Sequence, residues 1–247
     1  MATQRMLFLM SLSLLLHLWV AEAAAGHTEE AQAQALLRWK STLLNSSSLS
    51  SWSYAAPTCS WYGVTCDDHG RATQLRLTES NLNGTLDALY SVALSSLTVL
   101  QLYDNNLINT IPVNISLFLN LVTLNLGGNN FVGPIPYQFS KLKHLTDLDL
   151  SINMLSGPIP WSLSMLSTLE LLKLGQNNLS GGIPEELGAL HSLEVLDLNS
   201  NSLCGPIPTS LGQFSMLVWL DISGNHLSST IPFELGNLTS LVYIDLS

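Results

Sequence analysis

One pattern returns every 24 residues through most of this chain, and it restricts the fold more than any other feature. Each copy has two leucines (once Leu and Ile) at alternate positions, an asparagine three residues later, and an Ile-Pro pair that begins six residues after the asparagine. The repeated asparagines are Asn105, Asn129, Asn153, Asn177, Asn201 and Asn225. A weaker copy precedes them, with Ser80 at the asparagine position, and a partial copy begins at Leu241. Six copies in one register indicate a stack of repeated units.

The alternation of the leucines predicts one short β-strand in each copy, with leucines on one side and the intervening residues on the other. A single strand cannot bury its leucines, so we expect neighbouring copies to stack about 4.8 Å apart as a parallel sheet over a continuous core. The asparagine follows the strand, where its amide can satisfy buried backbone groups of the turn, and we expect the six asparagines to form a ladder. The Ile-Pro pair suits an irregular return segment.

The first residues are typical of a targeting segment. A weakly basic start precedes an apolar run from Met6 to Val20 and a segment of small residues that ends at Gly26. This order indicates a secretory signal peptide, and the run is shorter than the roughly 20 residues of a membrane-spanning helix. We therefore expect a signal peptide over residues 1–25, with an uncleaved membrane anchor as the alternative.

Residues 26–72 differ in composition from the repeats and are expected to cap them. The segment from Thr28 to Leu44 is expected to be helical, with an apolar face that includes Leu36, Leu43 and either Trp39 or Leu37. A solenoid needs such a cap where the core of its first repeat would otherwise meet water. Residues 73–247 then hold seven repeats and a partial eighth.

The chain has three cysteines. Cys59 and Cys66 lie close together in a chain that is expected to be secreted, which favours a local disulfide between them. Cys204 stands where several repeats have serine. It is either a regulatory or intermolecular thiol or a serine-to-cysteine change without a role.

The repeats and the cap together resemble one family. Asn177 to Pro184 follow the pattern N-x-L-x-G-x-I-P, and residues 35–66 resemble the N-terminal cap of plant leucine-rich-repeat receptor-like kinases. The resemblance extends over the chain after residue 25. It implies an α/β repeat solenoid, a plant-type extracellular leucine-rich-repeat superhelix with an N-terminal helical cap. The sequence departs from the pattern at Asn109 and Ser229, which replace the glycine, and at Phe131, which replaces a leucine.

The resemblance also implies a function. Ectodomains of this family lie at the plasma membrane and bind peptides, hormones or co-receptors, so we expect extracellular recognition of a peptide or protein ligand or a co-receptor, without catalysis by this chain. The sequence lacks a kinase pattern and a C-terminal cap, and this favours the truncated N-terminal part of such a receptor. The alternatives are a secreted inhibitor of a foreign glycanase, a receptor-like protein or co-receptor without a kinase, and a decoy or truncated product.

The residues between the paired leucines are expected to line the concave side of the solenoid and to contact the ligand. In the last four repeats an apolar column lies beside a mostly acidic one, which favours a partner with apolar and cationic groups. Tyr103 and Trp219 are the strongest single candidates, since aromatic residues are enriched at binding hot spots. The alternative is that these are consensus residues without a ligand. The expected contact residues are Val99, Gln101, Tyr103, Asp147, Asp149, Leu171, Lys173, Val195, Asp197, Trp219, Asp221, Tyr243 and Asp245.

Five N-x-S/T sequons are candidate glycosylation sites. We expect each of them in a loop or in the cap and none on a concave strand position. They are Asn45, Asn83, Asn114, Asn178 and Asn237.

Composition and motifs exclude other classes of protein. Eighteen acidic residues against 8 basic ones give a net charge of −10, which argues against a nucleic-acid partner. An apolar share of 47% argues against disorder. The sequence has no phosphate-binding loop, no nucleophile motif and no His/Cys metal spacing, so we expect no enzyme activity, no cofactor and no metal.

Overall fold

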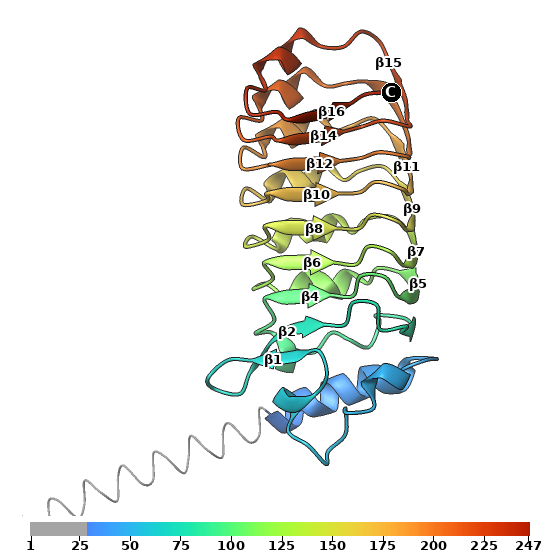
Figure 1. Cartoon of the computed structure of the whole chain (residues 1–247), viewed down its shortest axis with the longest axis vertical. Helices are drawn as coiled ribbons and strands as arrows, with labels where there is room; N and C mark the ends of the chain where they lie inside the picture. Colours follow the sequence, from blue (N-terminus) through green and yellow to red (C-terminus); the bar gives the residue numbers. More distant parts are fainter. Residues whose placement is uncertain (1–28) are drawn as a thin grey trace, which may run out of the picture.

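The computed structural model describes residues 29–247, which form a column of stacked strand-and-turn units with a helix across one end (Figure 1). The helix spans residues 29–42. The expected signal peptide and the expected helix start at Thr28 lie outside the described residues.

One strand from each repeat contributes to a nine-stranded sheet within residues 29–247. The expected parallel arrangement is confirmed for all strands except the first, which is antiparallel to the second. Leu124 pairs with Leu148, and Leu148 pairs with Leu172, so equivalent positions of successive repeats form columns across the sheet. In spatial order the strands are β1 (Val64–Cys66), β2 (Ala72–Arg76), β4 (Val99–Gln101), β6 (Thr123–Asn125), β8 (Asp147–Asp149), β10 (Leu171–Lys173), β12 (Val195–Asp197), β14 (Trp219–Asp221) and β16 (Tyr243–Asp245).

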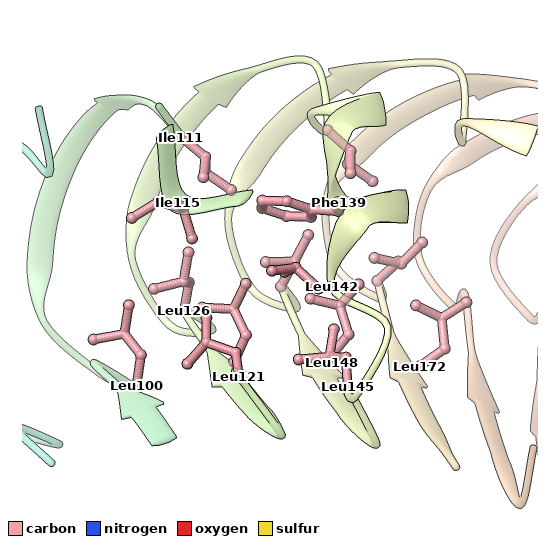
Figure 2. Packing of buried hydrophobic residues seen from close by; sticks show 14 of the residues in the cluster. Leu100, Ile111, Ile115, Leu121, Leu126, Phe139, Leu142, Leu145, Leu148 and Leu172 are labelled. Atoms are coloured by element: carbon pink, nitrogen blue, oxygen red, sulfur yellow. The ribbon is translucent and has the colours of Figure 1, made fainter. Parts of the chain in front are cut away.

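The leucines of this sheet form one wall of a continuous apolar core, and short 3-10 helices form the opposite wall (Figure 2). Figure 2 shows Leu126 and Leu148 on the sheet side and Phe139 on the helix side, and all three side chains are fully buried. From the fourth 3-10 helix onward, each begins directly after the proline of an Ile-Pro pair, whose fixed φ and missing N–H suit a helix start. The 3-10 helices are η1 (Ser47–Leu49), η2 (Thr58–Ser60), η3 (Val92–Leu94), η4 (Val113–Leu117), η5 (Tyr137–Lys141), η6 (Trp161–Met165), η7 (Glu185–Ala189), η8 (Thr209–Gln213) and η9 (Phe233–Asn237).

A second sheet follows the asparagines, where the sequence predicted only an irregular return segment. The residues after each asparagine are extended, turn one leucine such as Leu155 into the core, and pair their backbone with the next repeat. Pairing satisfies backbone groups that an irregular segment would leave without partners. The seven strands are β3 (Asn83–Gly84), β5 (Asn106–Thr110), β7 (Asn130–Gly133), β9 (Met154–Gly157), β11 (Asn178–Gly181), β13 (Ser202–Pro206) and β15 (His226–Ser228).

The glycine of the N-x-L-x-G pattern has a left-handed backbone, with φ of 78° at Gly133 and 80° at Gly181. Asn109 and Ser229, which replace this glycine, keep the same conformation, with φ of 71° and 74°. Asparagine visits this region readily, whereas a serine there is strained. The stacking of neighbouring repeats therefore imposes the turn even where the residue does not favour it.

We expect Ser229→Gly to raise the free energy of unfolding by about 1 kcal/mol, because glycine adopts a positive φ without the steric cost of a Cβ. The control is Ser228→Gly in β15, where extended backbone gives glycine no such advantage and we expect a loss of about 0.5–1 kcal/mol. Urea denaturation measures both changes. Equal losses in the two variants would contradict the strain at Ser229.

The asparagines bond both to their own repeat and to the preceding one. Nδ2 of Asn129 donates to the carbonyl oxygens of Leu102 at 2.9 Å and Leu126 at 3.1 Å, and its Oδ1 accepts from the backbone N–H of Leu107 at 3.1 Å. Asn153 then also donates to the Leu126 oxygen at 3.1 Å. Each strand-end carbonyl thus serves two asparagines, and this links the repeats into a ladder.

Three buried tryptophans hold the cap together. The ring centroids of Trp39 and Trp52 are 6.2 Å apart, and Trp52 stacks on Trp61 at 5.6 Å with 22° between the ring planes. Nε1 of Trp39 donates to the Thr85 oxygen at 2.8 Å, and Nε1 of Trp52 donates to the Tyr62 oxygen at 2.9 Å. The Thr85 contact ties the helix to the first repeat.

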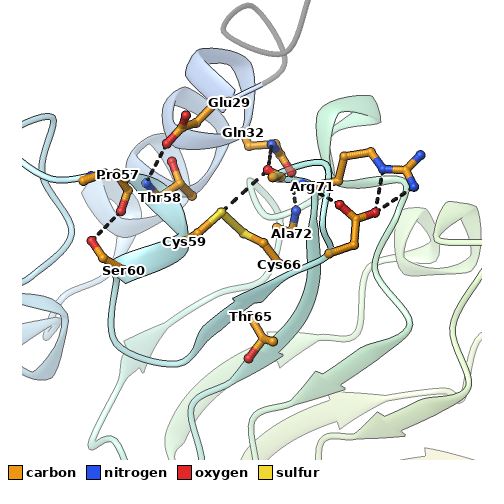
Figure 3. Close-up of a disulfide and its surroundings, with 12 residues drawn as sticks. Glu29, Gln32, Pro57, Thr58, Cys59, Ser60, Thr65, Cys66, Arg71 and Ala72 are labelled. Carbon is orange, nitrogen blue, oxygen red and sulfur yellow. Dashed lines mark hydrogen bonds and ion pairs between the residues drawn. A yellow bond between two sulfur atoms is a disulfide. The ribbon is translucent and has the colours of Figure 1, made fainter. Parts of the chain in front are cut away.

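A disulfide joins Cys59 to Cys66 at the end of β1 (Figure 3). Beside it, the helix residue Gln32 donates to the Gly70 oxygen at 3.2 Å and accepts from the N–H of Ala72 at 2.6 Å. The expected boundary between cap and repeats, after residue 72, falls inside β2. Because β1 of the cap pairs with β2, the cap and the repeats share one sheet.

The turn between β1 and β2 contains an ion pair in which Arg71 Nη2 lies 2.7 Å from Asp67 Oδ2. The side-chain hydrogen bond from Arg71 is the largest cause that lowers the pKa of Asp67 from 3.8 to about 2, and backbone N–H donors add to it. A lowered pKa stabilises the folded state above pH 3.8, and this contribution disappears as the pH falls through about 2. We expect Arg71→Ala to raise the pKa of Asp67 toward its ordinary value, as measured by NMR titration. An unchanged pKa in this variant would contradict the assignment.

Candidate functional site

The residues that alternate with the leucines project from the side of the nine-stranded sheet opposite the core. We call this surface the open face; it consists of those side chains on β2, β4 and the later even-numbered strands to β16. The register places the expected contact residues in columns, so that Trp219 pairs with Tyr243, and Asp221 pairs with Asp245. Residues far apart in sequence therefore form one continuous strip.

Most of the expected contact residues are accessible on the open face, but three are not. Val99, Asp149 and Asp221 are only 8%, 9% and 8% exposed. They lie beneath the surface that a partner would touch, which corrects the expectation for these three. Trp219 is exposed, and the half-buried candidates are Gln101, Tyr103, Asp147, Leu171, Lys173, Val195, Asp197, Tyr243 and Asp245.

The buried carboxylates close the turn after their strands. Asp149 Oδ1 accepts from the Ser151 N–H at 3.0 Å and from the Ser151 hydroxyl at 2.6 Å. Asp221 Oδ1 accepts from the N–H and hydroxyl of Ser223 at 3.1 and 2.6 Å. An aspartate two residues before a serine can hold a turn in this way, so part of the acidic column is structural.

Asp197 is the most accessible carboxylate in the middle of that column. Its Oδ1 accepts from the N–H and the side chain of Asn199 at 3.0 and 2.8 Å. Burial raises the pKa of Asp197, and the negative charges of Asp221 and Asp149 raise it further, against the N–H of Asn199 and the charge of Lys173. A cation at this position would relieve the repulsion.

The apolar column ends in two stacked aromatic rings. The centroids of Trp219 and Tyr243 are 3.7 Å apart with 13° between the planes, and Trp219 is 40% exposed. Val195 precedes Trp219 in the same column. Partial burial raises the pKa of Tyr243, and the charges of Asp221 and Asp245 add to this shift. This pair is the largest accessible aromatic surface on the open face.

Tyr103 lies instead at a polar depression of about 420 Å³ in the middle of the open face. Lys173 and Asp197 line it as well. A Cβ at Gly127 would lie 3.1 Å from Cδ2 of Tyr103, so the glycine leaves room for the ring. The structure thus separates the two aromatic candidates: Tyr103 lies in a polar depression, and Trp219 in an apolar and acidic strip.

A further column on the same face was not expected from the sequence. It consists of the first of the two residues between the leucines of each L-x-x-L stretch. In the last four repeats these residues are exposed beside the apolar column, and they are Glu170, Glu194, Val218 and Val242. These positions repeat every 24 residues like the others, so the same register would have identified them. They widen the apolar surface next to Trp219 and add two carboxylates to its edge.

The sequons lie off the open face, but not all of them are in loops. Asn83 and Asn178 belong to β3 and β11 of the second sheet, and Asn114 and Asn237 lie in the 3-10 helices η4 and η9. This corrects the expectation of loops, because the sequence revealed neither the second sheet nor these helices. Asn178, Asn114 and Asn237 are exposed. Asn45 and Asn83 are half-buried and form a backbone bridge.

Cys204 lies in β13 of the second sheet and is exposed, with His226 of β15 as its partner in register. Over the part of the chain that the structure describes, no group of three His, Cys, Asp or Glu side chains could hold a metal ion. Over the same residues, no helix has the length and apolar character needed to cross a membrane.

Two family descriptions match this arrangement. The family "Leucine rich repeat N-terminal domain" matches residues 29–67, and the family "Leucine Rich Repeat" matches residues 120–142, 144–166, 168–190, 192–214 and 216–238. Together they match more than half of the chain. The chain belongs to the leucine-rich-repeat family, in the form found in the ectodomains of plant receptor-like kinases.

Known leucine-rich-repeat proteins resemble this ectodomain over much of its length. A probable leucine-rich repeat receptor-like protein kinase of Arabidopsis thaliana is 40% identical over 111 residues, which cover 42% of this chain and 10% of that protein. PEPR1, in its crystal structure with AtPEP1, is 33% identical in sequence to this chain and superposes on it with a TM-score of 0.81. The match covers 87% of this chain and 31% of that chain. The Arabidopsis receptor kinase HAESA, solved with the peptide hormone IDA and the co-receptor SERK1, is 29% identical with a TM-score of 0.61 over 85% of this chain and 44% of HAESA.

The leucine-rich-repeat chain spans about a tenth of the length of the curated relatives that it matches. The family matches lie in the cap and the repeats, and those in the repeats include β6, β8, β10, β12 and β14 of the open face.

Proposed function

We propose that this chain recognises a peptide ligand outside the cell, through the open face of its leucine-rich-repeat solenoid, as the non-catalytic recognition part of a plant receptor. The single observation that carries the proposal is the continuous open face, where accessible side chains of successive repeats form aligned apolar and acidic columns. Such a surface matches an extended partner, because its columns run across many repeats.

The comparisons support this proposal without naming a ligand. HAESA is similar to this chain and has been solved with a peptide hormone and a co-receptor. RGFR1, solved with RGF2 as a plant peptide hormone receptor, is 40% identical over 60% of this chain, with a TM-score of 0.60. A co-receptor ectodomain is therefore the second partner that we propose.

A glycan placed on the open face tests the proposal. Thr123→Asn with Asn125→Thr creates a sequon on β6, on the open face. Peptides from plant extracellular fluid are passed over the immobilised secreted protein, and the retained peptides are identified by mass spectrometry. We expect retention by the natural protein and loss with the double variant. Equal retention, or no retention by either, would contradict recognition by the open face.

The same preparation tests the rival function of a glycanase inhibitor. We expect the secreted protein to leave the activity of a fungal polygalacturonase unchanged. Stoichiometric inhibition of that enzyme would replace the receptor proposal.

We expect glycans at the exposed sequons, Asn114, Asn178 and Asn237, and lower occupancy at Asn45 and Asn83. Nδ2 of Asn45 donates to the Asn81 oxygen at 2.8 Å, and Asn83 is half-buried beside it. Peptide mapping of the secreted protein measures the occupancy of each site. Unmodified asparagines at all five positions would contradict passage through the secretory pathway.

A further inference from the structure

The Trp219–Tyr243 pair leaves part of one ring face open. Tyr243 covers the face of Trp219 toward the end of the column. The neighbour on the other side is Val195, in register on β12. A valine side chain is much shorter than an indole, so the outer part of the Trp219 face on that side has no protein neighbour in the column, which agrees with its 40% exposure. A flat group can lie there against the indole.

Carboxylates flank this open ring face. Asp197 lies on the same strand as Val195 and is half-buried, whereas Asp221, on the strand of Trp219, is buried beneath this surface. The hydrogen bonds that Asp197 accepts from Asn199 both go to Oδ1, so its Oδ2 keeps its capacity to accept from a partner. Glu194 directly precedes β12, is exposed, and accepts the backbone N–H of Trp219 at its carbonyl oxygen, so it lies beside Trp219 on the other side of Val195 from Asp197. An occupant of the ring face therefore meets acidic groups on both sides.

Positive charge is scarce around these carboxylates. From residue 174 to Ser247 the sequence has seven acidic residues and no Lys or Arg. Lys173 opposes the raised pKa of Asp197, but it has no such effect at Asp245. The ion pair found within residues 29–247 joins Arg71 to Asp67 in the turn between β1 and β2, at the other end of the sheet from this strip. Lys173 is in register with Asp197 and offsets its charge in part, and no Lys or Arg follows Lys173 in the sequence to offset the other carboxylates.

We propose that the uncovered face of Trp219, together with Asp197 and Glu194, binds an arginine side chain of a peptide that lies on the open face. A guanidinium is planar and stacks on an indole, and its N–H groups can donate to a carboxylate while it is stacked. Neutral aromatic or aliphatic side chains would gain the ring contact but not the charge. This inference rests on the proposed peptide recognition and adds the class of side chain that is selected.

A displayed library of random peptides, selected on the secreted protein, provides the probe. We expect arginine to be enriched in the selected peptides. In a selected peptide, replacement of that arginine by citrulline keeps the shape of the side chain and removes its charge. By calorimetry we expect this exchange to weaken binding about tenfold to the natural protein.

Two variants assign the effect to this strip. In Trp219→Ala and in Asp197→Asn, we expect the same exchange to weaken binding much less, because one half of the subsite is missing. Trp161→Ala, at an exposed tryptophan on the helix side, is the control and should keep the full effect. Thermal melts show that each variant is folded, and Asp197→Asn keeps the shape of the side chain.

The outcomes separate this inference from the proposed function. Peptides that bind the open face without arginine enrichment, or with a citrulline effect that survives both variants, would overturn the arginine subsite and leave peptide recognition intact. Failure to select any peptide would overturn both.

Discussion

Replacement of Asn129 by alanine is expected to lower the free energy of unfolding by about 3 kcal/mol, because it leaves buried backbone groups without partners. Asn129 is 6% exposed, and its amide bonds to the carbonyl oxygens of Leu102, Leu126 and Gly127 and to the N–H of Leu107. Water does not easily replace it, since the side chain lies between two sheets and beside the core. Urea denaturation measures the loss.

The adjacent Asn130 provides the matched control. Its side chain is exposed in β7, and only its backbone takes part in the second sheet. We expect Asn130→Ala to change the free energy of unfolding by no more than about 0.5 kcal/mol. Equal effects of the two variants would show that the ladder does not carry the stability assigned to it.

The second large effect is expected in the cap, where Trp52→Ala should cost about 3–5 kcal/mol. Trp52 is 1% exposed and packs between Trp39 and Trp61. Its loss leaves a cavity between Trp39 of the helix and Trp61 of the cap, and the Tyr62 carbonyl loses its indole donor. We expect a lower midpoint temperature of thermal unfolding and faster proteolysis near the helix.

Trp161→Ala is the control for the cap variant, because it removes the same side chain from a position that is 60% exposed on η6. We expect a change below about 1 kcal/mol, in line with surface substitutions. A loss as large as that of Trp52→Ala would mean that the outer row of 3-10 helices packs against something other than solvent.

Most of the fold could be predicted from the repeat. The 24-residue spacing of leucines and asparagines predicts one strand per repeat, a parallel sheet and a common core, because period-2 alternation allows one buried side. The sequence did not predict the second sheet, since its strands alternate over only a few residues and a residue with positive φ lies at or next to the end of each. Their conformation comes from pairing with neighbours, which no single repeat displays.

The candidate site was predictable as a set of positions but not as a surface. The alternation places Asp149 and Asp221 toward the partner, yet both turn back to a serine two residues ahead and are buried. Asp197, at the same position of its repeat, makes the same pair of bonds to Asn199 and yet is only half-buried. Burial at these positions depends on side chains of adjacent residues and strands, so the sequence pattern alone does not predict which of the aspartates is accessible.

The sequence by itself determined the architecture of this protein: stacked repeats, a cap with tryptophans and a cysteine pair, and a surface made from the residues between leucines. These follow from local rules that every copy repeats. Only the tertiary structure decided which of these residues are accessible, and that Trp219 and Tyr243 stack 3.7 Å apart at the end of the apolar column. The physical reason is that contacts between repeats depend on side-chain lengths in adjacent strands, which the stacking brings together.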